Sequence, residues 1–128
     1  MPRPEMPPFI YVQNVFRTIQ EPSRIKFCET FPSRLRGLMF QWELSPNEGL
    51  LLVIAKESRI DSSIHMLFVM FDLAVFWINS NMQVVDKVIA KSWRPVYLPS
   101  RAARYTLEIH SSRFGDYNIG DLVEFQPA

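Results

Sequence analysis

Cysteine and glycine are both scarce in this sequence. Cys28 is the only cysteine, so the chain has no internal disulfide and no Cys-x-x-Cys pair for metal or redox chemistry. The 4 glycines are too few and too scattered to form a loop that cradles a phosphate. We therefore expect a fold held together by its hydrophobic core, with no metal and no cofactor, in which Cys28 is a small buried hydrophobic residue.

An excess of charge and a membrane-spanning run are also missing. The formal net charge is +1, which gives no electrostatic reason to expect binding to nucleic acid or to an anionic membrane. The longest apolar run, residues 64–78, is shorter than the roughly 20 residues that a membrane-spanning helix needs. Prolines at positions 2, 4, 7 and 8 interrupt any apolar core of a secretory signal. These observations predict a cytoplasmic protein that does not bind membranes.

The length and composition fit one globular domain. A chain of 128 residues is long enough to bury a sizeable core, and 48% hydrophobic residues exclude general disorder. No linker or internal repeat divides the sequence. We interpret residues 1–8 as a proline-rich leader and residues 9–128 as a single β-rich domain.

The apolar run at 64–78, IHMLFVMFDLAVFWI, organises the rest of the chain. Within it only His65 and Asp72 are clearly polar. Its β-branched and aromatic residues favour strand over helix. We predict two buried strands, or one long strand bent near Phe71, apolar on both faces as a central strand would be.

Shorter strands are expected on both sides of this run. Alternation of apolar and polar residues is clearest at 24–29 and at 103–110. In the second of these, Thr106, Glu108 and His110 share the face that we expect to be turned toward solvent. Further strands are predicted at 9–19, 50–54, 84–89 and 122–125, with a turn at 45–49 that Gly49 closes.

A change of period predicts one short helix. Leu35, Leu38 and Met39 fall at i, i+3 and i+4, and Ser33 is placed to cap the start of the helix. The elements together define the fold class. We predict a mainly β (β-rich α+β) domain, built as a compact curled antiparallel sheet or a small barrel with one short helix.

Five blocks of sequence carry a resemblance to a known family. They are Arg36-Gly37-Leu38-Met39; Gly49-Leu50-Leu51-Leu52-Val53; Ser63-Ile64-His65-Met66-Leu67-Phe68 followed by Phe71, Leu73, Val75 and Asn79; Ala103-Arg104-Tyr105-Thr106-Leu107-Glu108-Ile109; and Ile119-Gly120-Asp121-Leu122-Val123. In this order, over about residues 24 to 125, the chain resembles the small proteins grouped as the domain of unknown function 192 family. The resemblance implies a mainly β fold and no particular activity.

The chain also departs from the pattern of that family. Many members have Pro-Leu-Asp or Pro-Ile-Asp where this chain has Asp72-Leu73-Ala74, and Met70 stands where a basic or polar residue is common. If the missing carboxylate serves a shared site, this protein has lost or altered that site. If the triplet is architectural, Asp72 is a local rearrangement of the bend.

Two pairs of polar residues are candidates for a functional site. His65 adjoins the apolar run and forms an acid–base pair with Asp72 in our hypothesis, provided that a strand bend brings them together. Arg36 and Glu108 both approach the edge of the core, where we hypothesise an ion pair that ties the helix to the sheet. Each pair also has a purely structural interpretation. His65 can be a histidine at the edge of the core that is hydrogen-bonded to the backbone, and Arg36 and Glu108 can be two unrelated solvated charges.

A zinc site is not expected from the remaining ligand residues. Cys28, His65 and His110 are far apart in the sequence, and no two of them have the short spacing that zinc sites use. Motifs for nucleophilic or phosphoryl-transfer catalysis are also absent.

We therefore favour a non-catalytic domain that binds a small molecule or a protein partner, whose identity stays unknown. One alternative is a hydrolase-like enzyme that uses His65 with a carboxylate. Another is single-stranded nucleic-acid binding through the loop 91–105, which interleaves Arg94, Arg101 and Arg104 with Trp93, Tyr97 and Tyr105. The balanced charge favours packing of these aromatics over nucleic-acid binding.

Overall fold

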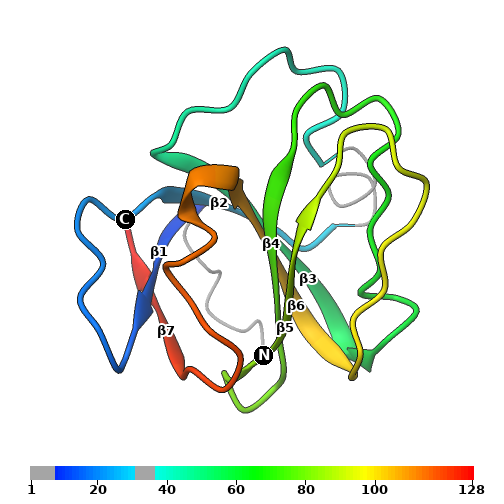
Figure 1. Ribbon diagram of the computed structural model, residues 1–128. Coiled ribbons are helices and arrows are strands. Elements are labelled where there is room, and N and C mark those ends of the chain that lie inside the picture. Colours follow the sequence, from blue (N-terminus) through cyan, green and yellow to red (C-terminus); the bar gives the residue numbers. More distant parts are fainter. Residues whose placement is uncertain (1–7, 31–36) are drawn as a thin grey trace.

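A computed structural model describes residues 8–30 and 37–128 of the chain. The described residues form seven strands and one short 3-10 helix (Figure 1). The strands are β1 (Phe9–Asn14), β2 (Arg24–Cys28), β3 (Glu48–Ser58), β4 (Leu73–Ile78), β5 (Val84–Ala90), β6 (Ala103–His110) and β7 (Val123–Pro127), and the 3-10 helix η1 is Ser111–Arg113.

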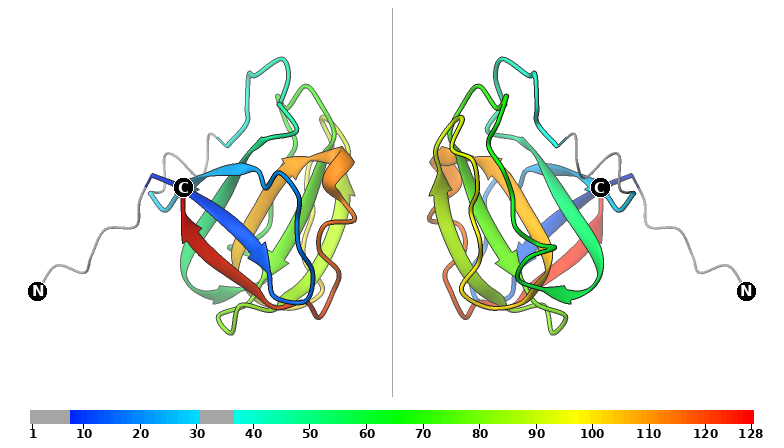
Figure 2. Two further views of the ribbon diagram at one scale, coloured as in Figure 1. Left: turned by 90° about the vertical axis from the view of Figure 1, so that its left-hand side faces the viewer. Right: turned by 90° about the vertical axis from the view of Figure 1, so that its right-hand side faces the viewer.

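A single sheet contains all seven strands, in the order β5-β4-β6-β3-β2-β1-β7. Neighbouring strands are antiparallel except β2 and β3, which run parallel. The sheet curls so that β1 and β7 lie across the strands of the other half (Figure 2). Near the two edge strands, Val84 N–H donates to the carbonyl of Asp121 and Val123 N–H to the carbonyl of Met82, each at 2.9 Å. The result is a partly closed barrel.

The curl separates two hydrophobic clusters, one inside it and one on the outer face of the sheet. Strand β4 contributes to both: Ala74, Phe76 and Ile78 to the inner cluster, and Leu73, Val75 and Trp77 to the outer one. All six residues of β4 are buried because β5 and β6 flank the strand and both of its faces are covered. This confirms the prediction of a central strand that is apolar on both faces.

The fold class is confirmed as mainly β, and most of the predicted strands are present. The strand predicted at 103–110 matches β6, and the hairpins β1–β2 and β4–β5 pair as expected. Two details differ. The sheet is not purely antiparallel, because β2 and β3 run side by side in the same direction. Gly49 does not close a turn but lies inside β3, opposite Ile109 of β6.

The predicted short helix is not found in the described part of the chain. Residues 33–36 lie outside the described residues, and residues 37–40 form a turn. Gly37 (φ 47°) and Phe40 (φ 64°) both have positive φ, which a right-handed helix does not allow. Among the described residues, η1 is the only helical segment.

The first half of the organising run is also not a strand. Residues 65–72 form a loop, and Ile64 makes only an isolated bridge with Tyr97. Met66 N–H donates to the carbonyl of Arg94 at 2.9 Å, and its own carbonyl accepts from Trp93 at 2.8 Å. The loop is apolar because Ile64, Met66 and Val69 pack into the outer cluster and cover the sheet.

Candidate functional site

A pocket of about 820 Å³ lies between the outer face of the sheet and the loops that cover it. Leu52 and Ile54 of β3 and Thr106 and Glu108 of β6 form the sheet side. Residues 37–39 and 60–66, together with Val69, form the opposite side. These segments belong to the loops that gather beside the sheet at the upper right of Figure 1. The pocket is therefore built by the same apolar loop that sequence patterns assign to a strand.

Glu108 is the most unusual side chain of this pocket. It lies on β6 between β3 and β4, opposite Leu50 and Val75, and only 5% of it is exposed to solvent. No described residue donates a hydrogen bond or offers a cation to its carboxylate. Burial raises the pKa of Glu108 to about 7, because an ionised carboxylate is poorly solvated there. The face of β6 that we expected to meet solvent is thus covered, since the loop 60–69 lies over Thr106 and Glu108.

Most hydroxyl groups that line the pocket with Glu108 donate their hydrogen to a main-chain carbonyl, so they do not donate to its carboxylate. Thr106 donates to the carbonyl of Ser62 at 3.2 Å. Ser62 donates to the carbonyl of Ser58, and Ser63 to that of Ile60. A hydroxyl has one hydrogen and two lone pairs, so these three groups retain only acceptor capacity. Ser58 accepts from Asp61 N–H at 3.0 Å and keeps its own hydrogen. Among these described side chains, acceptors outnumber donors.

His65 lines the same pocket and has one unsatisfied nitrogen. Its Nδ1 is buried and has no hydrogen-bond partner. Buried polar atoms usually have a partner, so this nitrogen is an exception, and because it is buried it is not exposed to the cavity itself. The structure therefore brings His65 and Glu108, two sequence candidates, to one cavity.

Asp72 is not part of this cavity. Its carboxylate accepts from Ser92 N–H at 2.9 Å and lies 3.3 Å from Lys91 Nζ. The pKa of Asp72 is held below its usual value, mainly by the hydrogen bond from Ser92. Asp72 thus connects the start of β4 to the chain after β5, and no hydrogen bond joins it to His65 within the described residues. The carboxylate that shares a pocket with His65 is Glu108.

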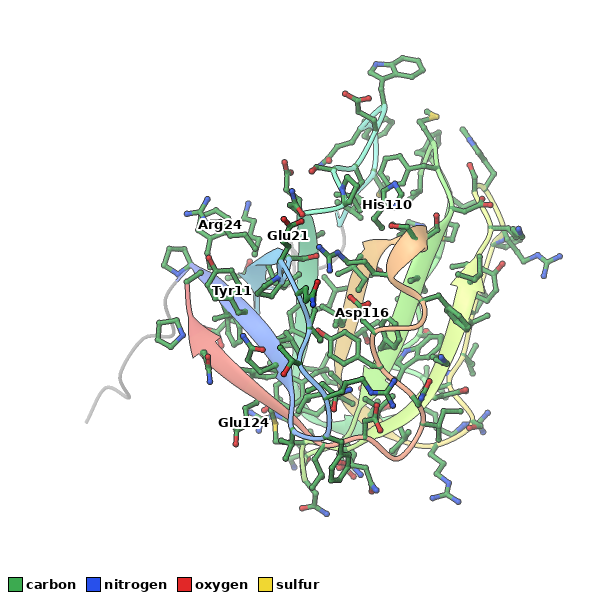
Figure 3. The ribbon with its side chains drawn as sticks, turned by 60° about the vertical axis from the view of Figure 1, so that its left-hand side comes forward. Tyr11, Glu21, Arg24, His110, Asp116 and Glu124 are labelled. Carbon is green, nitrogen blue, oxygen red and sulfur yellow. The ribbon has the colours of Figure 1, made fainter. Side chains whose placement is uncertain are left out.

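The remaining ligand candidates are separated or outside the described residues. Arg36 lies outside the described residues, so its ion pair with Glu108 stays a prediction. His110 stands at the end of β6 beside η1, where its Nδ1 accepts from Ser112 N–H at 3.1 Å (Figure 3). Cys28 is buried in the outer cluster. Across residues 8–30 and 37–128, no three His, Cys, Asp or Glu side chains are grouped to hold a metal.

The aromatics of the loop 91–105 are largely occupied inside the molecule. Tyr97 OH accepts from Lys91 N–H at 2.7 Å, and Tyr105 packs edge-on against Phe125 at 5.0 Å. Trp93 is 48% exposed but packs against Phe68, which in turn stacks on Phe40. Of the three aromatics in this loop, Trp93 alone presents much surface to a nucleotide base. The arrangement favours the packing interpretation.

Sequence patterns missed three polar residues that line the pocket. They are Thr106 on the sheet side and Ser62 and Ser63 on the loop side, and none of them stands out by residue type. The signal that could have found the site is the glutamate of β6, because it interrupts a strand whose flanking strands are apolar on that face. A charged residue between buried strands marks either a partner or a ligand.

The fold and pocket together define a small curled-sheet β protein with a ligand-sized cavity under its covering loops. The sequence model of the domain of unknown function 192 family, an uncharacterised ACR, matches residues 14–125. The chain belongs to this family. This confirms the resemblance seen in its sequence blocks.

Curated relatives share the family and have no assigned activity. A UPF0127 protein of Thermococcus kodakarensis is 38% identical over 106 residues, which cover 81% of this chain and 66% of that protein. A UPF0127 protein of Thermococcus gammatolerans is 37% identical over 103 residues, covering 79% of this chain and 65% of that protein. The chain spans just under two thirds of the length of these two relatives.

Two solved structures share the fold at low sequence identity. A protein of unknown function from Novosphingobium aromaticivorans superposes with a TM-score of 0.75 at 20% identity, covering 91% of this chain and 83% of that one. A candidate transcription regulator of Sinorhizobium meliloti gives a TM-score of 0.78 at 18% identity, covering 95% and 98%. These likenesses establish the fold alone.

Among the described residues, no helix is both long and apolar enough to cross a membrane.

Proposed function

We propose that this protein is a non-catalytic small-molecule-binding domain whose ligand occupies the pocket beneath the loop 60–69. The observation that carries the proposal is the cavity of about 820 Å³ with the buried carboxyl of Glu108 in its wall, which has no partner among the described residues. Pockets of roughly 300–1,000 Å³ with apolar walls and a few polar groups are typical ligand sites. A carboxyl buried without a donor lowers stability, so a ligand that supplies the donor recovers that loss.

The surroundings of the pocket support binding rather than passive packing. Leu52, Ile54, Met66 and Val69 provide an apolar wall, which would favour the body of an organic molecule. The covering loops are fixed by backbone hydrogen bonds, including Phe40 N–H to the carbonyl of Phe68 at 2.9 Å and Ile64 N–H to that of Tyr97 at 3.0 Å. A cavity under loops held in this way is largely formed before a ligand arrives, which reduces the entropy cost of binding.

Filling the pocket should weaken the binding of an apolar probe. Met39 is half-buried and lines the cavity, so Met39→Trp places a large ring in it. We expect N-phenyl-1-naphthylamine, a neutral dye that fluoresces in apolar surroundings, to bind the native protein and to bind Met39→Trp at least about tenfold more weakly. A fluorescence titration, checked by calorimetry, measures both.

Met70→Trp is the matched control, because Met70 is also half-buried on the covering loop but does not line the pocket. This variant should bind the dye as the native protein does. Equal binding by all three proteins would place the dye elsewhere, for example on Phe40, Phe68 and Trp93, and would refute the proposal.

A further inference from the structure

We propose that the ligand of this pocket is an organic cation: a primary or secondary ammonium group on an apolar body, with its N–H donating to the carboxylate of Glu108. The inference rests on the proposed function and adds the chemical class of the ligand. The hydrogen-bond donors, the acceptors and the charges that line the cavity all support this class of ligand.

The acceptor excess of the pocket requires a ligand that brings hydrogens. Thr106, Ser62 and Ser63 each donate to a main-chain carbonyl, so toward the cavity they can only accept. Glu108 accepts when it is ionised. An ammonium group has two or three hydrogens and no lone pair. A carboxylate or phosphate ligand would instead face oxygen atoms with few donors.

The charged residues among the described pocket lining are mostly acidic, which also favours a cationic ligand. Glu57, Asp61 and Glu108 are acidic, and Lys56 is the one lysine or arginine among the described lining residues; of these four, only Glu108 is buried. Glu57 is partly occupied, since it accepts from Ser80 N–H at 2.6 Å. The neighbours of Glu108 across the sheet, Leu50 and Val75, are apolar and provide no counter-charge. A bound cation would be the missing partner of a buried carboxylate.

The pH dependence of binding should follow the carboxyl of Glu108. Its raised pKa of about 7 means that an ammonium ligand meets a neutral carboxyl in acid and a carboxylate in mild alkali. The affinity for an amine should therefore rise about 30-fold between pH 5.5 and pH 8.0. The other charged and titratable groups of the lining are His65, Lys56, Glu57 and Asp61. The variant His65→Gln tests whether the pH dependence of binding belongs to Glu108 alone.

Three probes with one apolar body test the head group. They are 1-naphthylmethylamine, 1-naphthylmethanol and 1-naphthoate, titrated into the native protein by calorimetry at pH 5.5 and pH 8.0. We expect the amine to bind at least about tenfold more tightly than the alcohol at pH 8.0, and the acid to bind most weakly. Glu108→Gln should remove the preference for the amine and its pH dependence but keep binding of the alcohol. Asp72→Asn, which removes a carboxylate that does not line the pocket, should keep both, and His65→Gln should keep the pH dependence.

The outcomes separate this inference from the proposed function. Binding of the alcohol that Met39→Trp weakens, without preference for the amine, would keep the pocket function and overturn the cation. A preference for naphthoate that Arg36→Ala removes would also overturn it, because a cation of the protein would then serve the pocket. If none of the three probes binds, or if Met39→Trp changes nothing, the proposed function itself fails.

Discussion

Glu108→Gln should raise the free energy of unfolding by about 3 kcal/mol at pH 8 and leave it nearly unchanged at pH 4.5 in the absence of ligand. The native structure buries this carboxyl without a described donor, and its pKa rises from 4.5 to about 7. Each pKa unit corresponds to about 1.4 kcal/mol of preference for the protonated form. Glutamine has nearly the same shape and no charge, so it removes this cost.

The sign follows from proton binding. Between pH 4.5 and pH 7 the folded state holds a proton on Glu108 that the unfolded state has released, so stability falls as pH rises through this range. Above pH 7 the folded carboxyl ionises as well, and the full cost remains. Native protein should therefore lose stability relative to Glu108→Gln between pH 4.5 and pH 8.

Urea unfolding of both proteins at several pH values measures the difference. Glu124→Gln is the control, because Glu124 is an exposed residue of β7 and its replacement should change stability by less than about 0.5 kcal/mol (Figure 3). A loss of stability in Glu108→Gln at pH 8 would mean that a cation holds the carboxylate. The ion pair predicted with Arg36 would then be the explanation, and a non-additive double-mutant cycle of Arg36→Ala and Glu108→Ala would establish it.

The strands that could be predicted from sequence are those whose residue types mark them as strands. Strand β6 alternates apolar and polar residue types, and its bounds match the prediction of 103–110, although Thr106 and Glu108 on its polar face are buried. In β4 both faces are apolar, so composition identifies the strand even without alternation. Local pattern is sufficient where a strand lies between two others in the sheet.

The run at 64–78 shows where such reasoning fails. Its first half has the composition of a strand, but Phe68 has a φ of 61°, and Met66 bonds to the 91–99 loop instead of to a sheet neighbour. The apolar side chains are needed to cover the outer cluster, whatever the backbone conformation. Composition reports burial, and it reports strand geometry only when a partner strand is present.

The sequence predicts which residues belong to the candidate site, but it does not predict that they lie in one cavity. His65 and Glu108 are identified by residue type, because charged or titratable groups beside apolar segments need an explanation. Their meeting in one cavity depends on a loop that folds back over β3 and β6, and such long-range placement leaves no local signal. Asp72 was paired with His65 through proximity in sequence, but its contacts are with Lys91 and Ser92.

Gly49→Ala should destabilise the protein by about 3 kcal/mol, which is at the upper end of the usual cost of overpacking. A Cβ at this position would lie 2.6 Å from the main-chain carbonyl oxygen of Glu108, 2.6 Å from Cγ2 of Ile109 and 2.8 Å from Cδ1 of Ile25. Side chains can adjust, but the carbonyl oxygen belongs to β6 and moves only if the strand moves. Gly49 is therefore required by the close packing of β3 against β6.

The same substitution should weaken ligand binding, because the strand that must shift carries Glu108 into the pocket. We expect Gly49→Ala to lower the affinity for N-phenyl-1-naphthylamine at a temperature where the variant is still folded, as verified by circular dichroism. Gly115→Ala is the matched control: no atom lies within 4 Å of its added Cβ, so stability should change by less than about 0.5 kcal/mol and binding should be native. If Gly49→Ala unfolds at the same urea concentration as Gly115→Ala, β6 has room to move and the close contact does not limit the fold.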